Sequence, residues 1–153
     1  MKVLMVCLGN ICRSPLAEGL LANKVRLKEL DIEVDSAGTS GHHAGDPPDY
    51  RMQETALQFG VSINNIRSRQ FVIDDFDAFD LIFVMDTQNY NNVIEMAQTQ
   101  EDREKVKFIL NELYPRQNRA VPDPYYGGEQ GFEKVYQLLD EATDAFLSNI
   151  KEQ

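Results

Sequence analysis

The sequence of 153 residues has little cysteine and little histidine. Its only cysteines are Cys7 and Cys12, its only histidines are the adjacent His42 and His43, and it has no tryptophan. A secreted disulfide scaffold needs more cysteines spread along the chain. A zinc site needs ligands at a recognised spacing, which two adjacent histidines do not supply. We therefore expect no disulfide framework, no metal site and no metal cofactor.

The sequence also lacks a long apolar run and an excess of basic residues. No stretch approaches the roughly 18 apolar residues of a membrane-spanning helix. The apolar run at residues 3–6 is too short for the core of a signal peptide. With 15 Lys and Arg against 25 Asp and Glu, the net charge is −10, which opposes nucleic-acid binding. We expect a cytoplasmic protein with neither a nucleic acid nor a membrane as partner.

Apolar, β-branched stretches alternate along the chain with stretches of helical periodicity. Such alternation is typical of an α/β fold with a parallel sheet, and the length fits a single domain over residues 1–153. Ligands bind such sheets at the carboxyl ends of the strands, which makes the loop after the first strand a candidate site. The predicted strands cover residues 2–8, 32–36, 81–85 and 106–110.

Helices are predicted after each of the first three strands and at the end of the chain. Ser14 is the predicted N-cap of the first helix, with Pro15 at its first position. Gly60 is predicted to end the second helix and Asp86 to cap the third. The last helix is predicted over residues 131–150, and residues 37–49 and 111–128 as mostly loop. The apolar faces of the first two helices are predicted to comprise Leu16, Leu20, Leu27 and Leu30, then Met52, Ala56 and Phe59.

The segment from Cys7 to Pro15 carries the chemistry. Gly9 and Asn10 readily adopt a positive φ, so the loop between strand and helix can curl and turn its backbone N–H groups inward. The helix N-terminus adds partial positive charge, and the planar guanidinium of Arg13 suits two phosphate oxygens. These groups predict a cradle for a tetrahedral dianion.

Cys7 lies at the other end of this loop. Inward amides, a helix N-terminus and a cation all favour a thiolate, so a nucleophilic Cys7 would need no histidine to activate it. Ser14 could donate a hydrogen bond to the sulfur. Taken singly, Cys7 also fits a buried cysteine at the end of a strand, and Arg13 a solvated arginine at the start of a helix.

Five segments, in this order, resemble the low-molecular-weight protein tyrosine phosphatases. They are Cys7 to Pro15 with Ala17-Glu18, Asp35 to Thr39, Pro47 to Asp49, Met85-Asp86 and Asp123 to Gly127. The resemblance implies a three-layer sandwich whose four-stranded parallel sheet has the order 2-1-3-4. It also implies hydrolysis of phosphotyrosine through a cysteinyl-phosphate, without a cofactor.

The resemblance assigns roles to individual residues. Cys7 is the expected nucleophile, Arg13 the phosphate ligand, and Asp123, between two prolines, the proton donor. Asn10, Ser14 and Ser36 are expected to support the loop. The expected phosphate-binding residues are Leu8, Gly9, Asn10, Ile11, Cys12, Arg13 and Ser14, and the expected substrate wall comprises Ile11, His42, Tyr125 and Tyr126.

Two positions depart from the family pattern. His42 stands where a larger aromatic residue is common, and Ile66 where a histidine often belongs to the support network. We expect the departures to alter the substrate wall and to remove one polar member of the network. Cys12 either fills space beneath the loop or forms a reversible disulfide with Cys7.

The same fold leaves other functions open. Arginine phosphatases of the family carry Thr at the position of Ile11, and arsenate reductases need further cysteines downstream, which this chain lacks. A non-catalytic phosphate-binding module would need the cradle alone. The expected partners are phosphotyrosine proteins, with a tyrosine kinase among the candidates, and the expected assembly is a monomer or a weak dimer.

Overall fold

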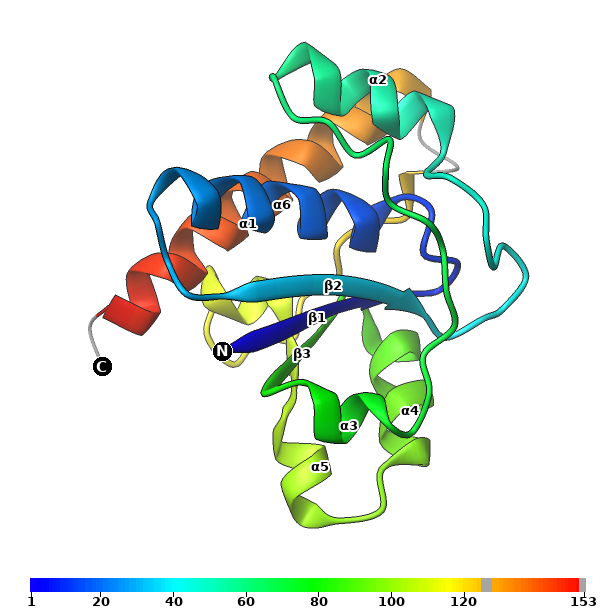
Figure 1. Ribbon diagram of the computed structural model, residues 1–153, viewed down its shortest axis with the longest axis vertical. Helices are drawn as coiled ribbons and strands as arrows, with labels where there is room; N and C mark the ends of the chain where they lie inside the picture. The colour runs from blue at the N-terminus through cyan, green and yellow to red at the C-terminus, as the bar shows by residue number, and fades with distance from the viewer. Residues whose placement is uncertain (125–127, 152–153) are drawn as a thin grey trace.

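The structure is a computed structural model that describes residues 1–124 and 128–151. It alternates strands and helices as the sequence pattern predicts, with short additional helices (Figure 1). The elements are β1 (Lys2–Cys7), α1 (Arg13–Leu27), β2 (Glu33–Gly38), α2 (Tyr50–Gln58), α3 (Asp75–Ala78), β3 (Leu81–Val84), α4 (Thr87–Met96), α5 (Gln100–Glu104), β4 (Val106–Phe108), the 3-10 helix η1 (Ile109–Glu112) and α6 (Gly128–Lys151).

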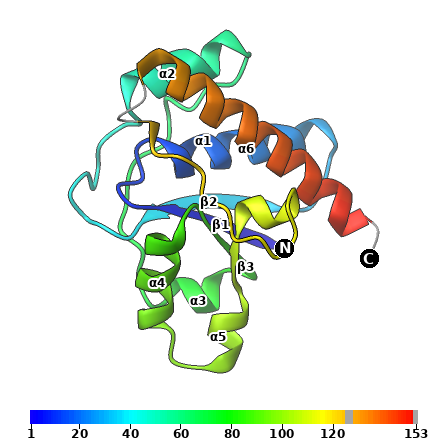
Figure 2. The same ribbon diagram turned by 180° about the vertical axis from the view of Figure 1, so that it is seen from behind.

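The four strands form one parallel sheet in the order β2-β1-β3-β4. Helices α1, α2 and α6 lie on one side of the sheet, and α3, α4 and α5 lie on the other (Figures 1 and 2). The prediction of a three-layer α/β sandwich with the strand order 2-1-3-4 is confirmed. The order places β1 inside the sheet, so that the loop after it is flanked by the ends of β2 and β3.

Strand β1 is buried on both faces, and its side chains alternate between two hydrophobic cores. Val3, Met5 and Cys7 belong to the core beneath α1 and α6. Leu4 and Val6 belong to the core on the α3 and α4 side. Because side chains alternate along a strand, the register that buries Val3 and Met5 also directs Cys7 toward α1.

Some predicted boundaries and positions were wrong. Helix α1 begins at Arg13, so Ser14 lies in its first turn instead of capping it. Leu27, expected in the core, is 71% exposed at the end of α1. Phe59 is 49% exposed, although its ring stacks on Tyr136 at 4.3 Å between centroids. The short helices α3, α5 and η1 were not predicted, because single helical turns carry too few residues to show a period.

Two predicted helix boundaries are confirmed. Asp86 is the N-cap of α4 and accepts a hydrogen bond from the Asn89 N–H at 2.8 Å. Gly60 follows the end of α2 with a φ of 82°, a backbone conformation that favours glycine. Within the described residues, no helix combines the length and the apolar character needed to cross a bilayer.

Candidate active site

A cavity of about 250 Å³ opens at the carboxyl end of β1. Three parts of the chain far apart in sequence meet there, namely the loop that joins β1 to α1, the loop after β2 and the loop before α6. This is the position at which parallel α/β sheets bind ligands. The cavity is lined by Cys7, Leu8, Gly9, Ile11, Cys12, Arg13, His43 and Asp123.

Carbonyl groups at the end of β1 and in the loop after it accept hydrogen bonds from the segments that surround the loop. The surrounding donors are Thr39 N to Cys7 O and Ser40 N to Leu8 O, both at 2.9 Å, Asp49 N to Ile11 O at 2.7 Å, and Ser68 Oγ to Gly9 O at 3.0 Å. Within the described part of the chain, the N–H groups of residues 8–12 donate no hydrogen bond. The loop therefore presents N–H groups that are available to an anion.

Backbone contacts and one left-handed residue set the shape of this loop. Asn10 has a φ of 56°, as predicted, whereas Gly9 does not adopt a positive φ. Gly9 instead makes room for a neighbour, since a Cβ there would lie 3.1 Å from Cδ2 of His43. A Cβ on Gly38, at the end of β2, would lie 2.7 Å from the Leu8 carbonyl oxygen. The loop can rest on β2 only because residue 38 has no side chain.

The Arg13 guanidinium is buried and held from one side. Its Nη1 donates to Asp86 Oδ2 at 2.8 Å and to the Val121 carbonyl at 3.0 Å. Within the described residues no partner takes up Nε or Nη2, so these donors are available to a ligand. Burial alone would lower the pKa of Arg13, but the charges of Cys7 and Asp86 and the hydrogen bond to Asp86 raise it overall, so the group stays charged.

Val121 also positions the loop that carries Asp123. Its N–H donates to the Met85 carbonyl at 2.7 Å, just beyond β3, while its own carbonyl accepts from Arg13. Pro122 and Pro124 restrict the backbone on both sides of Asp123. The carboxyl of Asp123 is thereby brought to the cavity that Cys7 lines.

A chain of hydrogen bonds runs beneath the loop to the sulfur of Cys7. Ser14 Oγ lies 3.0 Å from Cys7 Sγ, and Asn10 Nδ2 donates to Ser14 Oγ at 2.7 Å and to Ser36 Oγ at 3.0 Å. Ser36 Oγ donates to Glu18 Oε1 at 2.6 Å. The Asn10 side chain is fixed at its other end, because Oδ1 accepts from the Arg69 N–H at 3.0 Å.

Most hydrogen positions in this chain follow from the partners. Both hydrogens of Asn10 Nδ2 are used, one for each serine. Ser14 Oγ accepts from Asn10 and keeps its own hydrogen, which it can donate to Cys7 Sγ; a thiolate there, having no hydrogen, could only accept. A thiolate at Cys7 would therefore receive a hydrogen bond from Ser14 without any imidazole.

Cys12 lines the same cavity as Cys7, and its side chain is buried. Burial raises the pKa of Cys12 well above its usual range, and the negative charges of Asp49, Cys7 and Asp123 raise it further. Cys12 therefore keeps its proton at neutral pH.

Comparison with known proteins decides the family. The family model described as low molecular weight phosphotyrosine protein phosphatase matches residues 2–153. The chain belongs to this family. The recognition from sequence and the predicted enzyme class, a protein tyrosine phosphatase and therefore a hydrolase, are confirmed.

Relatives and solved structures cover nearly the whole phosphatase. The low molecular weight phosphotyrosine protein phosphatase of Gallus gallus is 39% identical over 95% of this chain and 93% of the relative. A crystal structure of the protein tyrosine phosphatase from Entamoeba histolytica, with Hepes in its active site, has a TM-score of 0.92 and 36% identity over 99% of this chain and 97% of that one. A Drosophila arginine phosphatase has a TM-score of 0.91 and 35% identity over 99% of this chain and 98% of that one.

The phosphatase differs from the sequence predictions at several site residues. His43, and not His42, lines the cavity, because His42 lies at the exposed turn where its N–H bonds Ser40 Oγ. The side chains of Asn10 and Ser14, expected both to support the loop and to belong to the phosphate site, are buried and bonded beneath the loop and do not line the cavity. Tyr125 and Tyr126, the other predicted wall residues, lie outside the described residues.

Sequence reasoning missed three residues that complete the site. Glu18 ends the hydrogen-bond chain, Arg69 orients Asn10, and Asp86 holds Arg13. Glu18 and Asp86 were present in the matching segments, but nothing in their spacing showed what they contact. Ile66 packs at the edge of the core and supplies no polar group, and the network is completed by Glu18 and Arg69.

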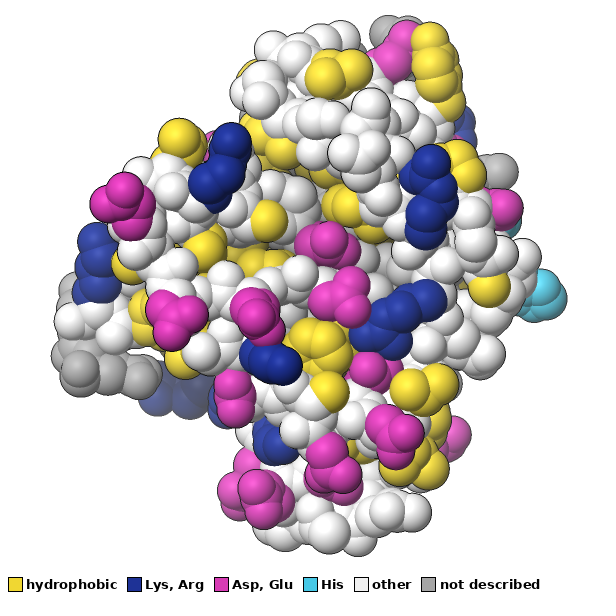
Figure 3. Space-filling view, in the orientation of Figure 1, with side chains coloured by type: hydrophobic (Ala, Val, Ile, Leu, Met, Phe, Trp, Pro, Cys, Tyr) yellow, Lys and Arg dark blue, Asp and Glu magenta, His cyan; other side chains and the backbone are white. Residues whose placement is uncertain are grey.

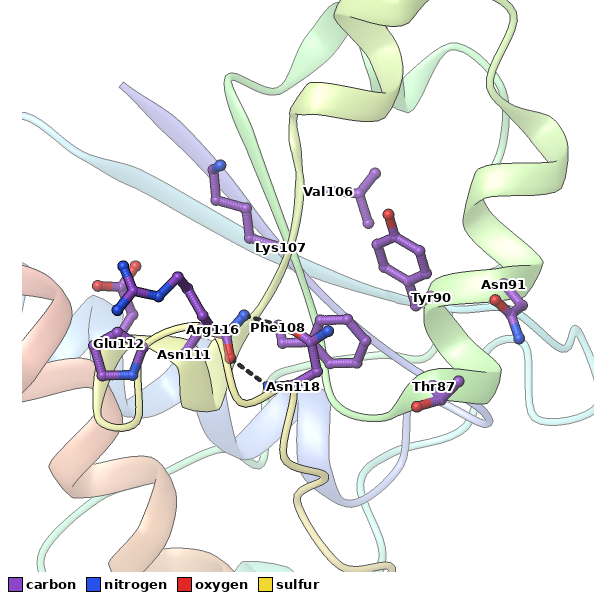
Figure 4. A pocket seen from close by; sticks show the side chains of 11 residues that line it. Thr87, Tyr90, Asn91, Val106, Lys107, Phe108, Asn111, Glu112, Arg116 and Asn118 are labelled. Atoms are coloured by element: carbon purple, nitrogen blue, oxygen red, sulfur yellow. Dashed lines mark hydrogen bonds between the residues drawn. The ribbon is translucent and has the colours of Figure 1, made fainter.

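A second, larger cavity of about 580 Å³ lies between α4 and the segment after β4 (Figure 4). The rings of Tyr90 and Phe108 stack at 5.1 Å between centroids on one side of it. Asn111 and Asn118 are joined by two hydrogen bonds on the other side. Its lining has no cysteine or histidine, and the described part of the chain contains no cluster of three or more His, Cys, Asp or Glu arranged for a metal ion.

Proposed function

We propose that the protein hydrolyses phosphotyrosine in proteins through a cysteinyl-phosphate on Cys7. One observation supports this most directly. Sγ of Cys7 lies in a cavity whose surrounding loop presents N–H groups with no partner in the described chain, beside a guanidinium with donors to spare. An oxyanion placed there would be bound by donors that need no rearrangement.

In the first step the Cys7 thiolate attacks phosphorus, the S–P bond forms and the bond to the tyrosine oxygen breaks. Asp123 gives its proton to that oxygen, so tyrosine leaves as the neutral phenol. Arg13 and the backbone amides from Leu8 to Arg13 bind the equatorial oxygens. The segment from Cys7 to Arg13 would thus serve as a phosphate-binding loop (P-loop).

In the second step water attacks the cysteinyl-phosphate. The Asp123 carboxylate takes a proton from the water, the S–P bond breaks, and inorganic phosphate and the Cys7 thiolate are released. The hydrogen bond from Ser14 stabilises the departing sulfur. Asn10 and Ser36 hold Ser14 in place.

Ile11 is the proposed discriminator between phosphate esters. Its branched apolar side chain lines the cavity and suits a phenyl ring better than a guanidinium. Arginine phosphatase activity is the second candidate, favoured by the likeness to the Drosophila enzyme. Arsenate reduction is disfavoured, because no cysteine follows Cys12 to resolve a disulfide. We place Tyr125, Tyr126 and His43 in the substrate wall.

The proposed setting of the reaction follows from the substrate class and the composition. The partners are phosphotyrosine proteins, and we include a tyrosine kinase among them. We propose a cytoplasmic protein that is a monomer or a weak dimer. Cys12 is proposed to form a disulfide with Cys7 when the nucleophile is oxidised.

Rapid mixing with p-nitrophenyl phosphate in the presence of a chelator tests the proposal. We expect a burst of p-nitrophenol stoichiometric with enzyme, and no burst from the Cys7→Ser variant, which still binds inorganic phosphate. The steady-state rates of phosphotyrosine hydrolysis, phosphoarginine hydrolysis and arsenate reduction should be compared side by side. We expect phosphotyrosine hydrolysis to be the fastest. Phosphate binding without turnover would instead identify a binding module.

A further inference from the structure

Glu18 is a carboxyl group in an unusual place. It is half-buried on α1, and Ser36 Oγ donates to it at 2.6 Å. It also lines a third cavity, of about 410 Å³, formed with Arg26 and Ile66 and away from the Cys7 cavity. Figure 3 shows this face, hollowed between α1 and the segment that follows α2. Glu18 therefore touches the hydrogen-bond chain beneath the loop without touching the substrate cavity.

We propose that Glu18 is a positioning residue whose ionisation sets the hydrogen bond that Ser14 gives to Cys7. This inference rests on the proposed function of the Cys7 site. It means that Glu18, on the opposite side of the loop, influences the reactivity of Cys7 in the substrate cavity.

Each hydrogen bond between Glu18 and Ser14 has a direction that depends on which group supplies the hydrogen. An ionised Glu18 can only accept, so it fixes the Ser36 hydrogen toward itself and leaves the Ser36 oxygen to accept from Asn10. Once protonated, Glu18 can donate as well as accept, and the Ser36 hydrogen is no longer held in one direction. Hydrogen bonds to a charged acceptor are also about twice as strong as those between neutral groups.

The groups around Glu18 place its titration in the physiological range. Burial raises the pKa of Glu18, the hydrogen bond from Ser36 lowers it, Asp35 on β2 raises it and Arg69 lowers it, with a net result of about 7. The charge of Arg69 is shared with two carboxylates, Asp35 at 3.0 Å and Asp75 at 3.1 Å. Arg26 is the cation on α1 itself that borders this third cavity.

The test is the ratio of kcat for the Glu18→Gln variant to kcat for the unmodified protein, on p-nitrophenyl phosphate across the pH range. Dividing the two profiles cancels titrations that both proteins share. We expect a ratio near one below pH 6, where Glu18 is protonated and resembles Gln, and a fall of about fivefold above pH 8. A ratio that does not change with pH overturns the inference, whatever its value.

Two matched variants separate the chain from other effects. Glu33→Gln makes the same change at an exposed carboxyl on β2, and its ratio to the unmodified protein should be flat with pH. In a Ser36→Ala background, Glu18→Gln should have no pH-dependent effect, because the link is already broken. An undiminished effect in that background would mean that Glu18 acts through space, against the proposal.

If Glu18→Gln does not fold, the ratio of kcat for Ser36→Ala to kcat for the unmodified protein should show the same fall with pH. A kcat ratio that does not change with pH overturns the proposal.

A second measurement does not depend on turnover. The rate at which iodoacetamide alkylates Cys7, followed by mass spectrometry in the Glu18→Gln variant and the unmodified protein, should give a ratio that also bends near pH 7. If the ratio of alkylation rates changes near pH 7 but the protein has no phosphatase activity, the proposed function is rejected and the effect of Glu18 on Cys7 is supported. If the protein hydrolyses phosphotyrosine but neither the kcat ratio nor the alkylation ratio changes with pH, the function is supported and the effect of Glu18 is rejected.

Discussion

Arg13 and Asp86 form an ion pair at the edge of the Cys7 cavity, with 2.8 Å between Nη1 and Oδ2. The Arg13 side chain is 5% exposed, whereas that of Asp86 is 24% exposed. Asp86 uses its other oxygen, Oδ1, to cap α4 through the Asn89 N–H. One carboxylate thus fixes both the beginning of a helix and the orientation of the guanidinium that faces the anion site.

The first prediction separates these two tasks. Asp86→Asn keeps an oxygen for the cap but presents an N–H₂ group to the Arg13 guanidinium. We expect the free energy of unfolding to fall by about 2 kcal/mol and the affinity for inorganic phosphate to fall about tenfold or more, because the guanidinium is no longer oriented. Calorimetry with phosphate and urea unfolding measure the two effects. Unchanged phosphate affinity would mean that Val121 alone holds Arg13.

The second prediction concerns Asp123 as proton donor. In Asp123→Ala, kcat/KM for phosphate esters with poor leaving groups, such as phosphotyrosine, should fall about 100-fold or more, because the phenolate must leave unprotonated. For p-nitrophenyl phosphate, whose leaving group needs no proton, kcat/KM should fall far less. Measuring kcat/KM confines the comparison to the first step. Equal losses for both esters would remove Asp123 from this role.

The fold and part of the site could be predicted from sequence because they depend on local patterns. Apolar runs and helical periods give the strands and long helices, and the residues from Cys7 to Ser14 are contiguous. The residues that were missed act across the fold. Glu18 meets Ser36, and Arg69 meets Asn10, only after β1 and β2 have paired. The choice of His43 over His42 depends on the path of a loop, which no periodicity specifies.

The third prediction tests the close approach of β2 to the phosphate loop. Gly38→Ala places a Cβ 2.7 Å from the Leu8 carbonyl oxygen and 3.1 Å from the Asn10 nitrogen, and both are backbone atoms that cannot rotate away. We expect a loss of about 1–3 kcal/mol in stability and a clear loss of phosphate affinity. Gly19→Ala is the matched control, since its Cβ would meet a methyl group of Ile63 at 2.5 Å. It should destabilise the fold and leave phosphate affinity unchanged. Equal effects of the two variants on phosphate affinity would contradict the prediction.

The fourth prediction concerns oxidation of the nucleophile. Peroxide should convert the Cys7 thiolate to a sulfenic acid, which the Cys12 thiol then attacks to form a disulfide and release water. Intact mass after mild peroxide should show the loss of two hydrogen atoms, and a thiol reductant should restore activity. The Cys12→Ser variant should instead accumulate Cys7 carrying two or three oxygens. Such over-oxidation in the unmodified protein would rule out protection by Cys12.

The fifth prediction is a dependence of stability on pH that belongs to Glu18. Its pKa is raised from the model-peptide value of 4.5 to about 7, chiefly by burial, so the folded protein binds this proton more tightly than the unfolded chain does. The stabilisation is complete below about pH 4.5 and is lost as the pH rises to about 7.

The change should amount to about 3 kcal/mol between these limits. Other groups also titrate, so the quantity to compare is the free energy of unfolding of the unmodified protein minus that of Glu18→Gln, measured by urea at each pH. This difference should decrease as the pH rises, whereas the corresponding difference for Glu33→Gln should stay nearly constant. A difference that is flat, or that increases with pH, would show that Glu18 is not held as a buried acid. A decrease would mean that ionised Glu18, which ends the hydrogen-bond chain leading to Cys7, lowers the stability of the fold at neutral pH.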